Sequence, residues 1–186
     1  MKFTETKLKG AYVIELEKLE DERGFFARTF CRKEFESHGL NPSLVQCNIS
    51  YNIKKGTLRG MHYQVAPYEE AKLVRCTTGG IYDVIMDLRP DSPTYCQWIA
   101  VELTAHSSAY SSQLTADFKM LYIPEGFAHG FLTLMNNTEV FYQMSEFYMP
   151  EYARGVRWND PAFNIQWPFD VVVISERDQK YSDFIL

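Results

Sequence analysis

The chain has 186 residues, of which 46% are hydrophobic, 15% aromatic and 23% charged. This composition excludes intrinsic disorder, and the length suits one domain covering residues 1–186 better than separate cofactor and substrate modules. The 24 Asp and Glu outnumber the 19 Lys and Arg, which gives a net charge of -5. No global positive field would attract nucleic acid or an anionic membrane, so any phosphate site must be a local cluster.

Short runs of β-forming residues, separated by turn residues, dominate the chain and predict an all-β sandwich or barrel. In residues 81–88, apolar side chains alternate with Asp83 and Asp87. This pattern predicts one face packed against the protein and another, with both aspartates, that meets water or a ligand. The expected strands are 11–16, 24–31, 44–53, 57–64, 71–77, 81–88, 95–103, 120–123, 128–134 and 139–147.

The helical signal is weak and predicts only a few short helices. Residues 32–39 end in a glycine that suits a helix C-terminus, and the sequence Ser175-Glu176-Arg177-Asp178 is typical of a helix start. Residues 104–117 lack a clear period, which favours a long surface loop or hairpin excursion.

Signals for export, membrane insertion and disulfides are missing from the sequence. Glu15 precedes any apolar stretch long enough for a signal peptide, and no run approaches the roughly 20 residues of a membrane span. We therefore expect a cytoplasmic protein with no membrane partner. Cys31, Cys47, Cys76 and Cys96 form no C-x-x-C pair, which predicts buried reduced thiols rather than zinc or disulfide chemistry.

Two histidines follow turns that contain glycine. His62 lies late in an expected strand, and His129 ends a Pro-x-Gly-x-x-His sequence. A lone strand histidine is most often structural. Strict alternation places Arg59 and His62 on opposite faces, but a bulge at Gly60 can bring both to one side. At this point the convergence of these residues stays open.

The spacings Gly-x5-His, ending at His62, and Pro-x-Gly-x-x-His, ending at His129, resemble the two motifs of the cupin superfamily. This resemblance implies a double-stranded β-helix jelly roll. Metal-binding cupins carry His-x-His in the first motif, whereas this chain has Gln64 at the second position. Two histidines with Glu69 or Glu70 make a poor ligand set, so we expect neither a metal nor a cofactor.

Lys72, Tyr142 and Asp178 are further ionisable candidates, and each has an ordinary structural explanation. Lys72 suits a solvated strand position beside Glu70, Tyr142 is one of 12 tyrosines that can pack a face, and Asp178 suits a helix start. Taken singly, none of them indicates a function.

Eight sequence blocks span nearly the whole chain, and together they are more specific than any one of them. They are Asp21-x-Arg23-Gly24-Phe25-Phe26, Gln46-x-Asn48-x-Ser50, Gly56-Thr57-Leu58-Arg59-Gly60-Met61-His62-Tyr63-Gln64, Lys72-Leu73-Val74, Asp87-Leu88-Arg89, Pro124-x-Gly126-Phe127-Ala128-His129-Gly130-Phe131, Trp158-Asn159-Asp160-Pro161 and Ile174-Ser175-x-x-Asp178. Their order and spacing resemble the dTDP-4-dehydrorhamnose 3,5-epimerase family. The resemblance implies a homodimeric jelly roll that epimerises a nucleotide-linked 4-keto-6-deoxyhexose beside its ketone, without metal or cofactor.

The same resemblance implies a role for each catalytic candidate. Inverting a carbon next to a ketone needs a base on one side of the sugar and an acid on the other. His62 matches the family's base and Tyr142 its acid. Asp178 matches the residue that orients the histidine, and Lys72 the cation facing the ketone oxygen as negative charge develops on it.

Substrate-binding positions also carry over by resemblance. Arg59, His129 and Arg177 match residues that bind the substrate, while Arg23, Gln46 and Asn48 match contacts on the nucleotide and phosphate side. The arginines suit a pyrophosphate, because a guanidinium donates two parallel hydrogen bonds.

Two departures from the family pattern affect the expected substrate. Arg28 and Ala153 stand where the family commonly has glutamates that line the substrate-binding region. We keep Arg28 among the expected substrate-binding residues and expect the nucleotide or the sugar to differ from the usual dTDP-linked substrate.

Three alternatives to a double epimerase stay open from the sequence. They are an epimerase acting at C3 or C5 alone, a 3,4-ketoisomerase of the same jelly-roll group on a non-dTDP sugar nucleotide, and a non-catalytic cupin that binds sugar nucleotides. The last has no need of both His62 and Tyr142 at family spacing. A homodimer is expected partly because 11–16 would otherwise leave an unprotected sheet edge.

Overall fold

Antiparallel strands build two sheets, and the computed structural model describes residues 1–105 and 118–185. The first sheet has six strands in the order β1-β2-β10-β7-β12-β5. Their bounds are β1 Lys2–Glu5, β2 Tyr12–Glu15, β10 Met120–Ile123, β7 Lys72–Thr78, β12 Thr138–Met144 and β5 Gln46–Asn52.

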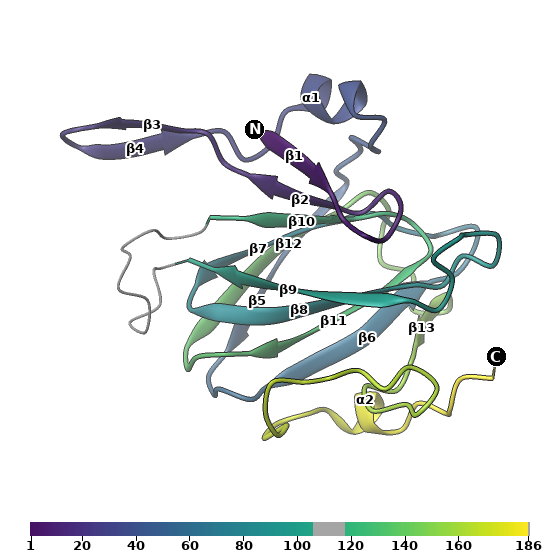
Figure 1. Ribbon diagram of the computed structural model, residues 1–186. Helices are drawn as coiled ribbons and strands as arrows, with labels where there is room; N and C mark the ends of the chain where they lie inside the picture. The colour runs from purple at the N-terminus through teal and green to yellow at the C-terminus, as the bar shows by residue number, and fades with distance from the viewer. Residues whose placement is uncertain (106–117, 186) are drawn as a thin grey trace.

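The second sheet has five strands in the order β13-β6-β11-β8-β9. Their bounds are β13 Ala153–Gly155, β6 Leu58–Gln64, β11 Phe127–Thr133, β8 Gly80–Asp87 and β9 Trp98–Thr104. Apart from β1 with β2 and β8 with β9, neighbouring strands in these sheets are not consecutive in the sequence, and the two sheets stack face to face (Figure 1). The expected all-β, cupin-like jelly roll is therefore confirmed.

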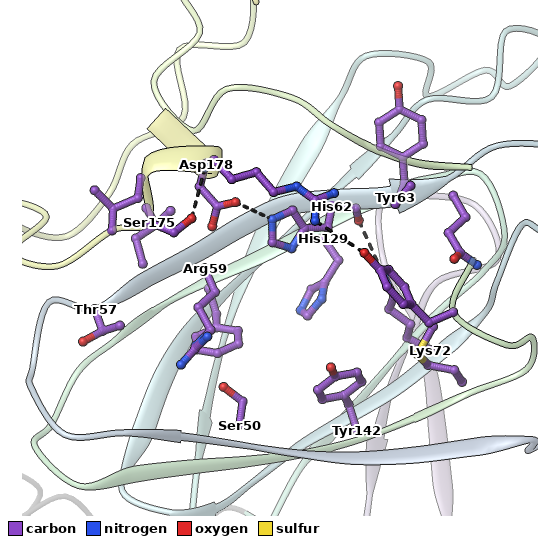
Figure 2. Close-up of a pocket in the computed structure, with 18 of the residues that line it drawn as sticks. Ser50, Thr57, Arg59, His62, Tyr63, Lys72, His129, Tyr142, Ser175 and Asp178 are labelled. Carbon is purple, nitrogen blue, oxygen red and sulfur yellow. Dashed lines mark hydrogen bonds and ion pairs between the residues drawn. The ribbon is translucent and has the colours of Figure 1, made fainter. Parts of the chain in front are cut away.

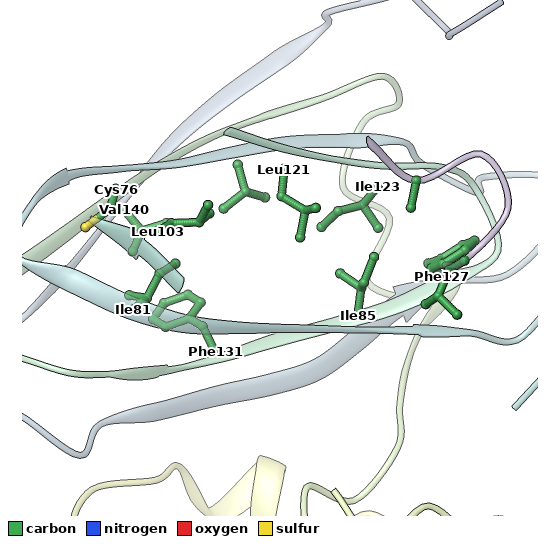
Figure 3. Packing of buried hydrophobic residues seen from close by; sticks show 12 residues of the cluster. Cys76, Ile81, Ile85, Leu103, Leu121, Ile123, Phe127, Phe131 and Val140 are labelled. Carbon is green, nitrogen blue, oxygen red and sulfur yellow. The ribbon is translucent and has the colours of Figure 1, made fainter. Parts of the chain in front are cut away.

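The main core fills the space between the two sheets (Figure 3). Alternate residues of each strand point inward, so each sheet contributes one face of β-branched, leucine and phenylalanine side chains. The six-stranded sheet supplies Val74, Cys76, Leu121, Ile123 and Val140, and the five-stranded sheet supplies Ile81, Ile85, Leu103, Phe127 and Phe131. Two satellite clusters cover the outer faces, one under α1 (Arg32–Ser37) and one under the C-terminal segment.

Strand β8 corrects the expectation of one packed and one wet face, because both of its faces are buried. Ile81 and Ile85 point into the main core, whereas Val84 and Met86 pack under the C-terminal segment. Asp83 and Asp87 share the inner face and have no exposed surface. The Asp87 carboxylate accepts hydrogen bonds from Arg89, Ser92 and Thr94, and Oδ1 of Asp83 contacts His129, whereas Oδ2 of Asp83 is buried without a hydrogen-bond partner in the described part of the chain. The alternating polarity here therefore marks buried polar groups rather than a wet face.

Both expected helices are present. Gly39 follows α1 with φ of 70°, and Ser175 caps α2 (Glu176–Gln179), its hydroxyl accepting a hydrogen bond from the Asp178 backbone N–H at 3.1 Å. Neither helix is long and apolar enough to cross a membrane, and no other described helix is.

Other local expectations need correction. Strands β1, β3 (Lys18–Asp21) and β13 were missed, and β4 (Gly24–Ala27) is shorter than the predicted run 24–31. The cysteines are all unpaired, but only Cys76 is buried, whereas Cys47 is exposed. The expected excursion at 104–117 lies, from residue 106 on, outside the described residues.

The sheet edges also differ from the expectation. Strand β2 pairs with β1 on one side and β10 on the other, so the predicted open edge at 11–16 is wrong. The outer strands of this sheet are β1 and β5. Strands β3 and β4 instead form a hairpin that projects from the body (Figure 1), with Leu19 and Phe26 each 70% exposed.

Candidate active site

One cavity of about 680 Å³ opens between the two sheets. Its walls come from β5, β7 and β12 on one side, β6 and β11 on the other, and the segment around α2 (Figure 2). Seven of the eleven expected site residues contribute to its lining, namely Arg59, His62, Lys72, His129, Tyr142, Arg177 and Asp178.

A β-bulge in β6 turns Arg59 and His62 to the same side. His62 pairs with His129 of β11 and Arg59 pairs with Phe131, so two residues of β6 lie opposite a single residue of β11. The extra residue reverses the alternation between Arg59 and His62. Gly60 permits this, because its φ is 140° and a Cβ there would collide with the backbone of Gly130. The bulge left open from the sequence is therefore confirmed.

The C-terminal segment is held against β6 by backbone hydrogen bonds. The backbone N–H groups of Val172 and Val173 donate to the Gly56 carbonyl at 2.8 and 3.1 Å, and Leu58 donates to the Val173 carbonyl at 2.8 Å. A side chain at Gly56 would collide with Val172. This close approach delivers α2 to the mouth of the cavity.

Asp178 and His62 form a hydrogen-bonded pair at that mouth. Nε2 of His62 lies 2.7 Å from Oδ1 of Asp178, and the Gly60 N–H donates to the other carboxylate oxygen at 3.3 Å. Burial acts to raise the pKa of Asp178, but the His62 hydrogen bond and charge outweigh it and lower that pKa overall. Asp178 therefore stays ionised and orients the imidazole, whose side chain is 40% exposed toward the cavity.

Tyr142 lies across the cavity from His62 (Figure 2). It comes from β12 of the six-stranded sheet, whereas His62 comes from β6 of the other sheet. Its hydroxyl has no hydrogen-bond partner in the described part of the chain. Burial raises the pKa of Tyr142, Arg59 lowers it, and Glu70 and Tyr148 raise it further, with a net rise. The phenol therefore keeps its proton at neutral pH.

Lys72 forms a buried ion pair, so the explanation of a solvated strand residue is wrong. Its Nζ lies 2.8 Å from Oε1 of Glu70, and the two side chains are 9% and 4% exposed. The same ammonium donates to the His62 carbonyl at 3.3 Å. An ammonium has three N–H donors, so one remains for a ligand in the cavity.

Three further cationic or imidazole side chains are held by polar partners. Arg59 Nε donates to Oδ1 of Asn52 at 2.8 Å, and Nε2 of His129 lies 2.6 Å from Oδ1 of the buried Asp83. The guanidinium of Arg177 donates to the hydroxyls of Tyr181 at 2.9 Å and Tyr148 at 3.4 Å.

Four expected substrate-binding residues do not line the cavity. Gln46 and Asn48 contact each other at 3.2 Å and border it, since Gln46 accepts from the Tyr148 backbone N–H and Asn48 contacts Met144. Arg23 lies on the projecting hairpin, where its side chain is 85% exposed. The last, Arg28, pairs with Glu34 at 2.9 Å. Neither arginine joins the cavity of its own chain.

Gln64 anchors backbone rather than offering a free ligand position. Its amide donates to the carbonyls of Tyr68 at 2.7 Å and Phe147 at 3.1 Å, and its oxygen accepts from the Met149 N–H at 2.6 Å. Within residues 1–105 and 118–185, no cluster of three His, Cys, Asp or Glu side chains is arranged to hold a metal ion.

Several residues that line the cavity, or that hold its lining side chains in place, were not singled out from the sequence as parts of the site. Asn52 and Tyr148 carry no local signal that separates them from other strand and loop residues. Asp83 did carry a local signal, because it and Asp87 alternate with isoleucines on one face of the strand. Glu70 was considered only as a metal ligand, whereas it pairs with Lys72.

A jelly-roll cavity with a His–Asp pair on one wall, a protonated tyrosine on the other and a lysine beside them defines an enzyme site built for moving protons between two faces of a bound ligand. Comparisons with known proteins identify the family. The model described as dTDP-4-dehydrorhamnose 3,5-epimerase matches residues 5–185. The dTDP-4-dehydrorhamnose 3,5-epimerase of Shigella flexneri is 39% identical over 187 residues, covering 98% of this chain and 97% of that protein.

Solved structures agree with this result. The dTDP-4-dehydrorhamnose 3,5-epimerase of Bacillus anthracis with TDP and PPi bound is 38% identical, with a TM-score of 0.89 over 98% of this chain and 99% of that chain. A dTDP-6-deoxy-D-glucose-3,5-epimerase from Legionella pneumophila in complex with dTDP-4-keto-L-rhamnose is 34% identical, with a TM-score of 0.84 over 95% and 89%. The chain belongs to the dTDP-4-dehydrorhamnose 3,5-epimerase family of carbohydrate isomerases.

Proposed function

We propose that this protein, as one domain over residues 1–186, epimerises a nucleotide-linked 4-keto-6-deoxyhexose at C3, C5 or both. One observation carries the proposal: His62 and Tyr142 lie on opposite walls of the same cavity (Figure 2). A base and an acid on opposite faces of a sugar ring are the minimum that inversion of a carbon requires. The TDP and keto-rhamnose complexes of the two related structures support a sugar nucleotide as the substrate class.

The first step is removal of a proton from a carbon next to the ketone. His62 takes this proton, and the Asp178 carboxylate 2.7 Å away stabilises the imidazolium that forms. The bonding electrons move onto the ketone oxygen and produce an enolate. The remaining N–H of Lys72 donates to that oxygen as its charge grows. Tyr142 then donates its phenolic proton to the opposite face of the same carbon, which completes the inversion.

The nucleotide diphosphate supplies negative charge that local cations can hold. Arg59, His129 and Arg177 line the cavity. Asn52 and Tyr181 hold the two guanidinium groups in place, which reduces the entropy lost on binding. Gln46 and Asn48 border the same cavity and provide amide groups for the nucleotide end.

The direct test is solvent exchange. The purified protein is incubated in deuterated water with a panel of 4-keto-6-deoxyhexoses linked to dTDP, CDP or GDP, and deuterium is located by NMR. We expect deuterium at C3, at C5 or at both, with an inverted configuration at each labelled carbon. Label at one carbon alone would assign a single-carbon epimerase, and absence of label from every substrate would contradict the proposal.

A homodimer is the natural completion of this site. A projecting two-stranded hairpin is marginally stable alone, and the β3–β4 hairpin exposes Leu19 and Phe26. We infer that a second copy of the chain packs against this hairpin. Arg23 of the hairpin, which does not line the cavity of its own chain, then enters the cavity of that second copy. Light scattering at micromolar concentration should therefore give the mass of two chains.

Mixing two defective variants tests whether Arg23 acts across the dimer. Arg23→Ala and His62→Ala should each lower activity, and an equal mixture that exchanges subunits should regain about a quarter of wild-type activity, since half the dimers then hold one complete site of two. A monomer in solution, or no recovery after demonstrated subunit exchange, would contradict the arrangement.

Substrate choice should depend on the two departures from the family pattern. Ala153 lines the cavity, while the Arg28 guanidinium donates to Glu34. The Arg28 guanidinium can only donate hydrogen bonds, and the Ala153 methyl can neither donate nor accept them. The hydrogen-bond acceptors that glutamates would offer at these two positions are therefore missing. We expect the preferred substrate to differ from dTDP-4-keto-6-deoxyglucose in nucleotide or sugar, and Ala153→Glu to shift kcat/KM toward the dTDP compound about tenfold.

The comparison is a ratio of kcat/KM values across the same panel of substrates, with Arg28→Glu measured in parallel. If the wild type uses the dTDP compound best and neither substitution changes that preference, the two positions do not determine specificity.

A further inference from the structure

Glu70 is a buried carboxylate in the cavity that the mechanism above does not use. It precedes β7 and lines the cavity together with Lys72 and Tyr142. Its Oε1 pairs with Lys72, but its Oε2 is buried with no hydrogen-bond partner in the described part of the chain. Buried carboxylate oxygens are nearly always hydrogen-bonded, so an unsatisfied one at a ligand cavity points to a partner that the ligand brings.

The carboxylate has the capacity for this contact. An ionised carboxylate offers about four acceptor positions, and Lys72 occupies one of them. Rotation about the terminal torsion of a glutamate is soft, so the free acceptors can turn toward a bound ligand while Lys72 stays paired. Glu69, the preceding residue, is exposed and takes no part in the cavity lining.

Lys72 and Glu70 place a donor and an acceptor side by side, 2.8 Å apart. A 4-keto sugar presents the matching pair, because its ketone oxygen accepts and the hydroxyl on the adjacent C3 donates. The other neighbour, C5, carries a methyl group and the ring oxygen and has no hydroxyl to donate. We propose that Glu70 binds the C3 hydroxyl of the substrate while Lys72 binds the ketone, so that the pair selects an α-hydroxyketone and fixes which side of the ketone is C3.

This inference rests on the proposed function, and its consequence is a specificity that depends on one hydroxyl. The test compares a 4-keto-6-deoxyhexose nucleotide with its 3-deoxy analogue, following deuterium uptake at whichever of C3 and C5 the wild type labels, since both compounds carry hydrogen at both carbons. Glu70→Gln keeps a carbonyl oxygen for Lys72 but removes the charged acceptor. We expect Glu70→Gln to lower kcat/KM about ten- to hundredfold for the hydroxylated substrate and to change the value for the 3-deoxy analogue little. Glu69→Gln should match the wild type on both.

The wild type alone gives a second readout that needs no folded variant. It should exchange the carbon it labels in the hydroxylated substrate at least about tenfold more efficiently than the same carbon of the analogue. Equal efficiency for the two compounds, or an equal loss on both in a Glu70→Gln protein of normal melting temperature, would overturn the role of Glu70, since a residue that acts only on Lys72 or on folding affects both substrates alike. Failure of the wild type to exchange any 4-keto sugar would instead remove the proposed function, and this inference with it.

Discussion

Replacing His62 by alanine should abolish solvent exchange at both carbons beside the ketone, with a loss of about 10²- to 10⁴-fold in rate. Its imidazole is paired with the Asp178 carboxylate at 2.7 Å and is 40% exposed, whereas the other cavity imidazole, His129, is only 11% exposed. Without it, no enolate forms at either carbon. The rate of deuterium uptake into substrate, followed by NMR, is the measurement.

Replacing Tyr142 by phenylalanine should separate exchange from inversion. His62 still forms the enolate in this variant and returns a solvent-derived proton to the original face, so deuterium enters while the configuration is kept. The substrate recovered should carry label and show little product.

Matched controls are His38→Ala and Tyr95→Phe, since both residues lie outside the cavity lining. They should exchange and invert as the wild type does. Exchange above a few percent of the wild-type rate in His62→Ala would show that another group is the base, and loss of all exchange in Tyr142→Phe would show that the tyrosine does more than donate.

Replacing Asp87 by alanine should cost about 3 kcal/mol of stability. Its buried carboxylate accepts from the Arg89 guanidinium at 2.8 and 2.7 Å and from the hydroxyls of Ser92 and Thr94 at 2.5 and 2.6 Å. Alanine leaves Arg89 and both hydroxyls without their acceptor. Chemical denaturation at neutral pH measures the loss.

The same network predicts how stability depends on pH. Burial alone would raise the pKa of Asp87, but hydrogen bonds from Arg89, Ser92 and Thr94 outweigh it and lower the pKa from 3.8 to about 2. A depressed carboxylate pKa stabilises the fold above the unfolded value, and this contribution of about 2 kcal/mol disappears as the pH falls through 4 toward 2.

Asp87→Asn should therefore flatten the pH dependence of unfolding between about pH 5 and pH 2, since the amide does not titrate there. The exposed neighbour Asp91 provides the matched control, because Asp91→Asn should leave the slope unchanged. An Asp87→Asn protein that loses stability with acid as steeply as the wild type would show that other carboxylates control acid unfolding.

Local sequence patterns predicted strands and helices correctly where a single pattern was clear. The alternation of residues 81–88 and the turn residues around each run located β8 and its neighbours, and the Ser-x-x-acid sequence located α2. The same patterns misread what the strand faces meet. Asp83 and Asp87 look like solvent positions in sequence, but the facing six-stranded sheet and the loop after β8 bury them, which only long-range packing decides.

The sequence by itself determined that the chain is all-β, because strand alternation and turn residues are local properties. The jelly roll and the selection of His62, Tyr142, Asp178 and Lys72 came from the resemblance of eight ordered blocks to a known family. Only the tertiary structure decided how they meet. Asp178 lies 116 residues from His62 and reaches it because the C-terminal segment pairs with β6. The bulge at Gly60 and the opposed walls of the cavity likewise depend on strands that are distant in sequence. Hydrogen bonding between such strands is set by the closed sheets as a whole, and no window of neighbouring residues encodes it.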